Sequence, residues 1–158
     1  MMNERKLNQE LRFEQKLTPY LKKLCNSSEA IRKMYLYNDE YENIPVNLDR
    51  DILIEKANTP IKGIVHKFNS RVLFLISYTC FANCRFCERQ DRVGVGLDSS
   101  GRLDTEQIDQ GLEYIKSNVE INEVVFSGGD PLTNPLGLLH AIEALKTPIQ
   151  PKILPNQL

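Results

Sequence analysis

The residues best suited to chemistry are three cysteines, Cys80, Cys84 and Cys87, which form a C-x3-C-x2-C arrangement. Thiolates are soft donors that suit iron–sulfur clusters, and this spacing lets one loop wrap three corners of a cubane. Three protein ligands leave one iron open, and an open iron can bind a substrate or cofactor, which a pure electron carrier does not need. The spacing therefore predicts a 4Fe–4S cluster with an open iron, which Phe86 could shield.

Other interpretations of the same cysteines stay open. A zinc site would need four ligands, and His66 is the nearest histidine. A disulfide or a set of structural thiols fits less well, because a tight cysteine cluster in a reducing compartment more often marks a metal or redox centre. Cys25 stands far from the cluster, on one face of an expected helix, and we expect it to be a small buried apolar residue.

A second candidate site is the turn formed by Ser127, Gly128, Gly129 and Asp130. Glycines let the backbone approach a ligand closely, and a carboxylate can accept hydrogen bonds from an ammonium group. The same four residues are also ordinary turn formers. The specificity of this motif therefore comes from its pairing with the cysteine cluster.

Two apolar, β-forming stretches precede these motifs and predict buried strands, one over residues 72–78 and one over 123–126. Helical patterns fill much of the remaining chain, and their starts carry N-capping residues or prolines. The first predicted helical region covers residues 1–35, with a break at Thr18-Pro19 and a restart at Ser28. The second covers residues 104–119; a capping box of Asp104 and Gln107 opens it, and its apolar stripe reaches Val119. The third covers residues 134–146 and has Leu138, Leu139, Ile142 and Leu145 on one face.

The alternation of strand and helix predicts an α/β fold with parallel strands joined by right-handed crossovers. In such folds ligands bind at the carboxyl ends of the strands, where both motifs lie. We expect a helical N-terminal lead-in over residues 1–62, the first β-α-β-α units of a larger, partial α/β barrel over 63–146, and a proline-rich tail over 147–158.

Composition narrows the class of protein further. The 158 residues are 41 % apolar and 26 % charged, which suits one globular domain. A net charge of -1 gives no reason to expect binding to nucleic acid or to an anionic membrane. No apolar run approaches the ~20 residues that span a bilayer, and the polar N-terminus does not read as a secretory signal. We expect a cytoplasmic protein.

At the two motifs the sequence resembles the radical S-adenosylmethionine superfamily, whose hallmark is C-x3-C-aromatic-C after the first strand of a partial or complete TIM-type barrel. The resemblance implies that Cys80, Cys84 and Cys87 hold a 4Fe–4S cluster and that S-adenosylmethionine chelates its open iron beside Ser127 and the Gly128–Asp130 turn. The reduced cluster would split S-adenosylmethionine to a 5'-deoxyadenosyl radical that abstracts a substrate hydrogen. An electron donor such as flavodoxin or ferredoxin is implied.

Finer features, over roughly residues 17–146, resemble the lysine 2,3-aminomutase family and its branch that works with elongation factor P. This family of isomerases shifts an amino group between adjacent carbons of lysine or a related amino acid and uses pyridoxal 5'-phosphate. The resemblance implies that Arg71 contacts the pyridoxal phosphate group, with Lys67 at a second basic position, and that Arg89 pairs with the substrate carboxylate. The features are residues 30–33, 59–68, 71–75 and 127–132.

The sequence departs from that family towards its end. The family's Schiff-base lysine and its acidic readers of the substrate ammonium have no counterpart here, and Lys146 and Lys152 are not in a matching context. We expect a truncated or frameshifted aminomutase, which the open sheet edge favours, or one part of a split protein. Two other functions stay open: another radical S-adenosylmethionine enzyme, such as an activase, and a non-enzymatic iron–sulfur or zinc-binding module.

Overall fold

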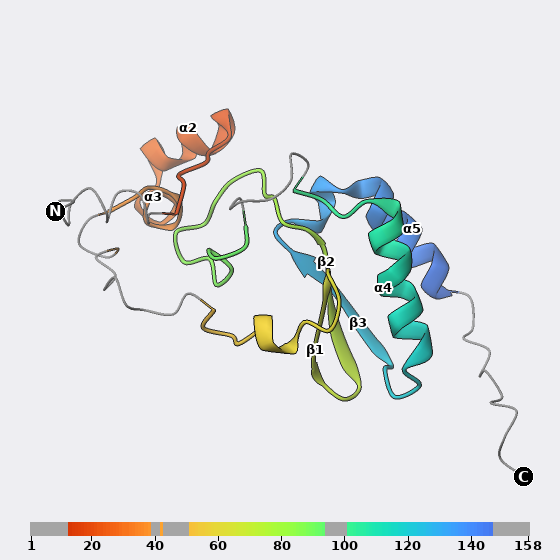
Figure 1. Cartoon of the computed structure of the whole chain (residues 1–158). Helices are drawn as coiled ribbons and strands as arrows, with labels where there is room; N and C mark the ends of the chain where they lie inside the picture. Colours follow the sequence, from red (N-terminus) through yellow and green to blue (C-terminus); the bar gives the residue numbers. More distant parts are fainter. Residues whose placement is uncertain (1–12, 39–41, 43–50, 94–100, 147–158) are drawn as a thin grey trace, which may run out of the picture.

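The computed structural model describes residues 13–38, 42, 51–93 and 101–146. The described chain is a mixed α/β structure with four α-helices and one open sheet (Figure 1). In order, its elements are α2 (Pro19–Ser27), α3 (Glu29–Tyr35), the 3-10 turn η1 (Lys56–Asn58), β1 (Ile64–Phe68), β2 (Arg71–Ser77), α4 (Thr105–Ser117), β3 (Glu123–Gly128), the 3-10 turn η2 (Pro131–Thr133) and α5 (Pro135–Lys146).

The sheet has the strand order β1-β2-β3. Strands β2 and β3 are parallel and are joined through α4, so the predicted parallel pair is confirmed. Strand β1, which the sequence analysis left without a strand prediction, pairs antiparallel with β2, so the sheet is mixed rather than purely parallel. The reason is the short connection, because the two residues between Phe68 and Arg71 can form a hairpin but not a crossover.

Local capping determines where the helices begin, as the sequence predicted. The Thr18 hydroxyl accepts from the Leu21 amide at 3.2 Å, and the Ser28 hydroxyl accepts from the Ile31 amide at 3.4 Å. The predicted capping box of α4 is present, with the Gln107 amide 2.8 Å from Asp104 Oδ1. Such caps satisfy amides that have no partner within the helix.

Three helical predictions were wrong in detail. Residues 13–18 are not helical. Helix α4 ends at Ser117, because the Asn118 side chain donates to the Tyr114 carbonyl at 2.6 Å, and Val119 beyond it is 82 % exposed. Leu139 on α5 is also exposed, although its neighbours Leu138 and Leu145 pack on the core. The predicted tail over 147–158 lies outside the described residues.

Helices α4 and α5 lie together on one side of the sheet (Figure 1). Phe74 of β2 is fully buried on that side, stacked on Phe126 with ring centroids 6.0 Å apart. Gly111 explains how α4 comes so close, since a Cβ at this position would lie 2.5 Å from the Phe74 ring. A mid-helix glycine is unfavourable by roughly 0.5–1 kcal/mol relative to alanine, and here the close packing offsets it.

The carboxyl ends of β2 and β3 are joined by a dense set of hydrogen bonds, which we call the strand-end clasp (residues 77–79 with 128–134). The Gly129 amide donates to the Ser77 carbonyl at 2.6 Å, and the Asp130 amide donates to the Thr79 carbonyl at 2.9 Å. The buried hydroxyls of Ser77 and Thr133 are 2.7 Å apart. The clasp places the start of the cysteine loop beside the Gly-Gly-Asp turn.

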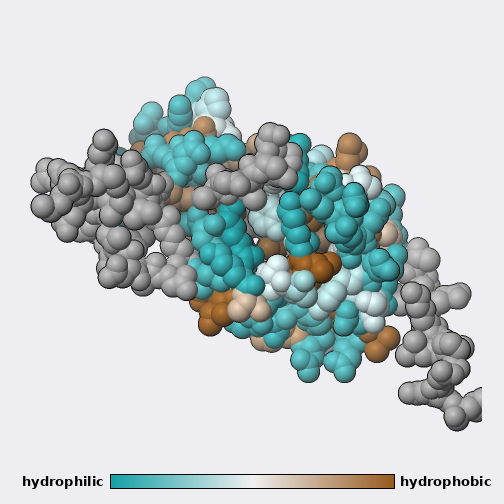
Figure 2. All heavy atoms as spheres, viewed as in Figure 1, coloured by the Kyte–Doolittle hydropathy of each residue, from teal (hydrophilic) through white to brown (hydrophobic). Residues whose placement is uncertain are grey.

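On the side drawn in Figure 2, hydrophilic side chains cover most of the surface of the described residues and hydrophobic patches are scattered between them. None of the helices that the structure describes combines the length and apolar character needed to cross a bilayer.

Replacement of Gly128 by alanine tests the clasp. Gly128 has φ +114°, and a Cβ there would lie 2.0 Å from the Ser77 carbonyl oxygen. Because the obstacle is backbone, Gly128→Ala should lower the free energy of unfolding in urea by about 2–4 kcal/mol. Gly101→Ala is the matched control, since its φ is also positive but its Cβ would meet nothing closer than 3.4 Å, and it should lower that free energy by about 1 kcal/mol. Equal losses would contradict the clasp.

Candidate metal centre and adjoining pocket

The three clustered cysteines follow β2 in a loop that starts at the strand-end clasp. All three thiols are free and partly exposed. Burial, followed by the charges of Cys87, Asp130 and Cys84, raises the pKa of Cys80. Burial likewise raises the pKa of Cys87, with Cys84 among the contributing charges. The structure thus brings the three thiols close enough for their charges to act on one another, and metal binding here would have to release protons.

The described residues form no ready-made site for a single metal ion. In the part of the chain that the structure describes, no three His, Cys, Asp or Glu side chains surround a point that one metal ion could occupy. A structural zinc site needs four such ligands at about 2.0–2.3 Å from the metal, so the zinc alternative gains no support. That three thiols on one loop hold a cubane, whose irons each take a separate thiolate, stays a prediction from their spacing.

Residues around the thiols differ sharply in exposure. Phe81 and Phe86 are 60 % and 63 % exposed, so Phe86 covers nothing in this structure and its shielding of a cluster stays a prediction. Burial, followed by the charge of the nearby Cys84, raises the pKa of Tyr35 on α3. Cys25 is buried, as predicted, with its thiol 4.0 Å from the Ile31 carbonyl oxygen.

The Gly-Gly-Asp turn lies beside the first cysteine. Asp130 is close enough to Cys80 to contribute to its raised pKa. One Asp130 carboxylate oxygen accepts from the Leu132 amide at 3.0 Å and thereby caps η2. A Cβ on Gly129 would lie 2.4 Å from the Thr79 carbonyl oxygen, so packing against β2 accounts for both glycines without a ligand. A ligand role for the turn rests on its position next to Cys80.

Arg89, two residues after the last cysteine, is held by an acidic residue that the sequence analysis missed. Arg89 Nε and Nη2 donate to the two carboxylate oxygens of Glu55 at 3.0 and 2.6 Å, and Nη1 lies 3.4 Å from the Ser127 hydroxyl. Burial alone would lower the pKa of Arg89, but the hydrogen bonds and charge of Glu55 outweigh it, and the pKa is raised. The only feature of the sequence that could have pointed to Glu55 is its position directly after the apolar stretch Ile52–Ile54.

Arg71 and Arg89 line one pocket of about 400 Å³. This is within the range of about 300–1,000 Å³ that is usual for small-molecule sites. Arg71 is at the start of β2, where its Nε donates to Glu123 Oε2 at 2.5 Å, and Lys67 Nζ donates to the Leu53 carbonyl at 3.2 Å. The pocket is lined by Leu53, Glu55, Val65, Lys67, Phe68, Arg71, Leu73, Arg89 and Val125.

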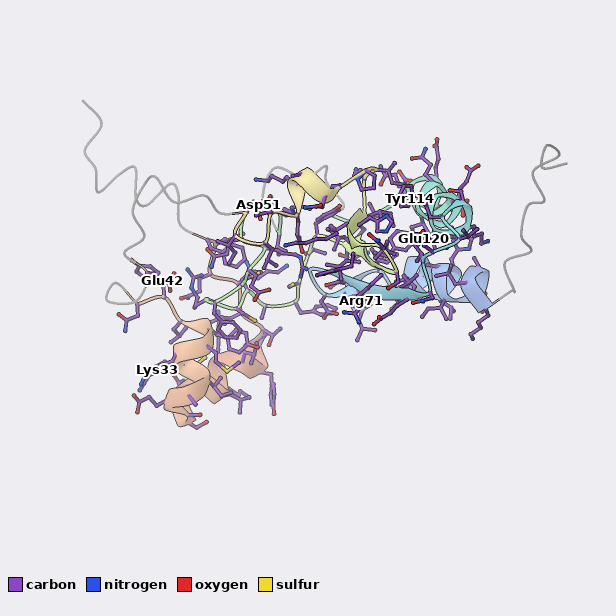
Figure 3. The ribbon with its side chains drawn as sticks, turned by 90° about the horizontal axis from the view of Figure 1, so that it is seen from below. Lys33, Glu42, Asp51, Arg71, Tyr114 and Glu120 are labelled. Atoms are coloured by element: carbon purple, nitrogen blue, oxygen red, sulfur yellow. The ribbon has the colours of Figure 1, made fainter. Side chains whose placement is uncertain are left out.

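The pocket lies on the sheet face opposite α4 and α5. Side chains alternate between the two faces along a strand, so Lys67 lines the pocket while the preceding His66 turns to α4, where its Nδ1 is 2.7 Å from the Tyr114 hydroxyl. Figure 3 shows Arg71 and Tyr114 on different sides of the strands. His66 therefore has a packing role, and the uncovered face carries the pocket's cations.

Replacement of Glu55 tests whether its ion pair with Arg89 stabilises the fold. The Glu55 side chain is 5 % exposed and also lies 3.9 Å from Arg92. Glu55→Gln removes the charge that compensates two largely buried guanidinium groups, so the free energy of unfolding should fall by about 3 kcal/mol. Glu29→Gln, at an exposed ion pair with Lys33, should leave the urea midpoint unchanged. Similar midpoints for the two variants would refute this account.

Known proteins of similar sequence include L-lysine 2,3-aminomutases. Three L-lysine 2,3-aminomutases are similar to the chain: that of Methanococcus maripaludis is 34 % identical over 125 residues, that of Escherichia coli 33 % over 102 and that of Haemophilus influenzae 40 % over 82. These alignments cover 76 %, 65 % and 52 % of this chain. The chain spans only 28 %, 28 % and 23 % of the lengths of those relatives.

The model of the Radical SAM superfamily matches residues 74–156. The matched range takes in most of β2, the three cysteines and the Gly-Gly-Asp turn. It covers more than half of the 158 residues. The chain therefore belongs to the radical S-adenosylmethionine superfamily.

Proposed function

We propose that this chain is a radical S-adenosylmethionine protein of the lysine 2,3-aminomutase type. The observation that carries the proposal is the meeting, at one edge of the sheet, of three free thiols after β2 and a Gly-Gly-Asp turn after β3. A bound 4Fe–4S cluster would supply the electron that splits S-adenosylmethionine into methionine and a 5'-deoxyadenosyl radical, the species that starts migration of an amino group.

The chain's own residues have defined roles in this proposal. Cys80, Cys84 and Cys87 provide three thiolates, and no fourth cysteine lies in the loop, so one iron stays open to S-adenosylmethionine. Gly128 and Gly129 let the turn pack against the backbone of Ser77 and Thr79, just before Cys80. The Asp130 carboxylate offers its charge to the methionine ammonium group. A one-electron donor such as flavodoxin or ferredoxin is required as a partner.

Arg89 is suited to bind the carboxylate of lysine or a related amino acid. A guanidinium has five N–H donors, and three of them are used by Glu55 and Ser127. The two that remain, one on each terminal nitrogen, can donate to a carboxylate. Glu55 holds the Arg89 guanidinium at the pocket through its two hydrogen bonds.

Pyridoxal 5'-phosphate, the second cofactor of the aminomutase family, fits the pocket only in part. Arg71 and Lys67 offer two cations for a phosphate group. The one lysine that lines the pocket, Lys67, donates its amine to the Leu53 carbonyl, and Lys146 lies at the exposed end of α5. No other lysine among the described residues lines the pocket.

A second candidate is a radical S-adenosylmethionine enzyme that works without pyridoxal phosphate, such as an activase. The two candidates share the thiols and the Gly-Gly-Asp turn and differ in the pocket. An increase in turnover with pyridoxal 5'-phosphate and lysine favours the aminomutase type, and indifference to both favours the second candidate.

Formation of 5'-deoxyadenosine tests the shared chemistry. After anaerobic reconstitution and reduction with dithionite, the chain should convert S-adenosylmethionine into 5'-deoxyadenosine and methionine, which mass spectrometry can quantify. Cys84→Ala removes a thiolate ligand and should abolish the product, a loss of at least about 100-fold. Cys25→Ala removes a thiol outside the motif and should retain the activity. A fully loaded cluster that yields no 5'-deoxyadenosine, or a Cys84→Ala variant that still forms it, would rule the proposal out.

A further inference from the structure

Two polar residues inside the cysteine loop are buried and have no role in the proposed chemistry. Asn83 and Arg85 flank Cys84 and are 4 % and 8 % exposed, whereas Phe81 and Phe86 of the same loop are exposed. Burial of polar groups is unfavourable unless they are hydrogen-bonded. The partners of these two side chains therefore show what the loop is attached to.

Each nitrogen of the Arg85 guanidinium donates to a residue from the N-terminal part of the chain. Nε donates to Glu42 Oε1 at 2.8 Å, Nη2 donates to Glu42 Oε2, and Nη1 donates to the Phe13 carbonyl at 2.9 Å. The guanidinium carbon lies 5.8 Å from the ring centroids of both Phe13 and Tyr37. A bidentate carboxylate pair enclosed by two aromatic rings is among the strongest polar contacts available to arginine.

Backbone contacts join the loop to the same region. The Asn83 side chain donates to the Glu14 carbonyl at 2.9 Å, and the Asn83 amide donates to the Lys16 carbonyl at 3.0 Å. The Arg85 amide donates to the Met34 carbonyl at 2.8 Å. The middle of the loop is thus bonded to residues 13–42, which contain α2 and α3, while the start of the loop is bonded to the sheet.

We infer that Arg85 is a positioning residue, which holds the cysteine loop against residues 13–42 so that Cys84 and Cys87 can face the cluster together with Cys80. Lysine cannot replace it, because a single ammonium cannot donate to both Glu42 oxygens and the Phe13 carbonyl in this planar geometry. The inference rests on the proposed function for the identity of the cluster, but the attachment of the loop can be measured without one.

Hydrogen exchange of the cluster-free chain tests the attachment directly. Arg85→Lys and Glu42→Gln should each speed exchange of the Asn83 and Arg85 amides on the order of tenfold, because the pair that keeps these amides bonded is lost. Arg32→Lys makes the same chemical change at an exposed position of α3 and should leave those rates unchanged. Loss of protection confined to the loop and residues 13–42 supports the inference. Unchanged rates, or equal loss across β2 and β3, would overturn it.

Cluster retention tests the consequence for the metal centre. After reconstitution, the concentration of chelator that removes half of the iron should fall about 10–100-fold in Arg85→Lys and Glu42→Gln, the usual effect of removing a residue that orients metal ligands. The unchanged chain and the Arg32→Lys variant should lose half of their iron at the same concentration of chelator. Equal retention by all four proteins would overturn the inference. If the unchanged chain binds no cluster, the proposed function fails, and the exchange rates still decide whether Arg85 attaches the loop.

Discussion

The hydrogen bonds between the ends of β2 and β3 determine where every part of the candidate site can lie. The Gly129 and Asp130 amides donate to the carbonyls of Ser77 and Thr79, and only glycine fits at the two positions nearest to β2. Because the cysteine loop begins just after Thr79, this contact places the thiols and the Gly-Gly-Asp turn at the same edge of the sheet. Tight backbone packing, rather than a ligand, explains why these two positions need glycine.

The rest of the site is assembled around that edge by two buried ion pairs. Arg85 joins the middle of the cysteine loop to residues 13–42 through Glu42, and Arg89 joins the end of the loop to the lead-in of the sheet through Glu55. The loop is therefore held at its start by the clasp and further along by carboxylates from two other segments. This arrangement leaves the thiols in a fixed neighbourhood and directs Arg89 at the uncovered face of the sheet, where the pocket lies.

Features encoded by local sequence could be predicted, and those made by distant partners could not. The thiol spacing, the capping box at Asp104 and the apolar run of β2 each depend on neighbouring residues, and they were identified from sequence. The partners Glu42 and Glu55 lie 43 and 34 residues from the arginines they bind, in polar stretches without a periodic pattern. Strand β1 was missed because two consecutive polar residues, His66 and Lys67, interrupt its apolar pattern. Val119 was wrongly placed in α4 because a helical stripe does not reveal that the helix ends before Asn118.

Electron paramagnetic resonance of the reconstituted, reduced chain, recorded with and without S-adenosylmethionine, tests the central claim most directly. If Cys80, Cys84 and Cys87 hold a cluster with an open iron beside Asp130, the spectrum will show a reduced 4Fe–4S signal whose g-values change when S-adenosylmethionine is added. A cluster signal that stays the same in excess S-adenosylmethionine would contradict the claim, because an open iron at this edge of the sheet would then not bind the cofactor.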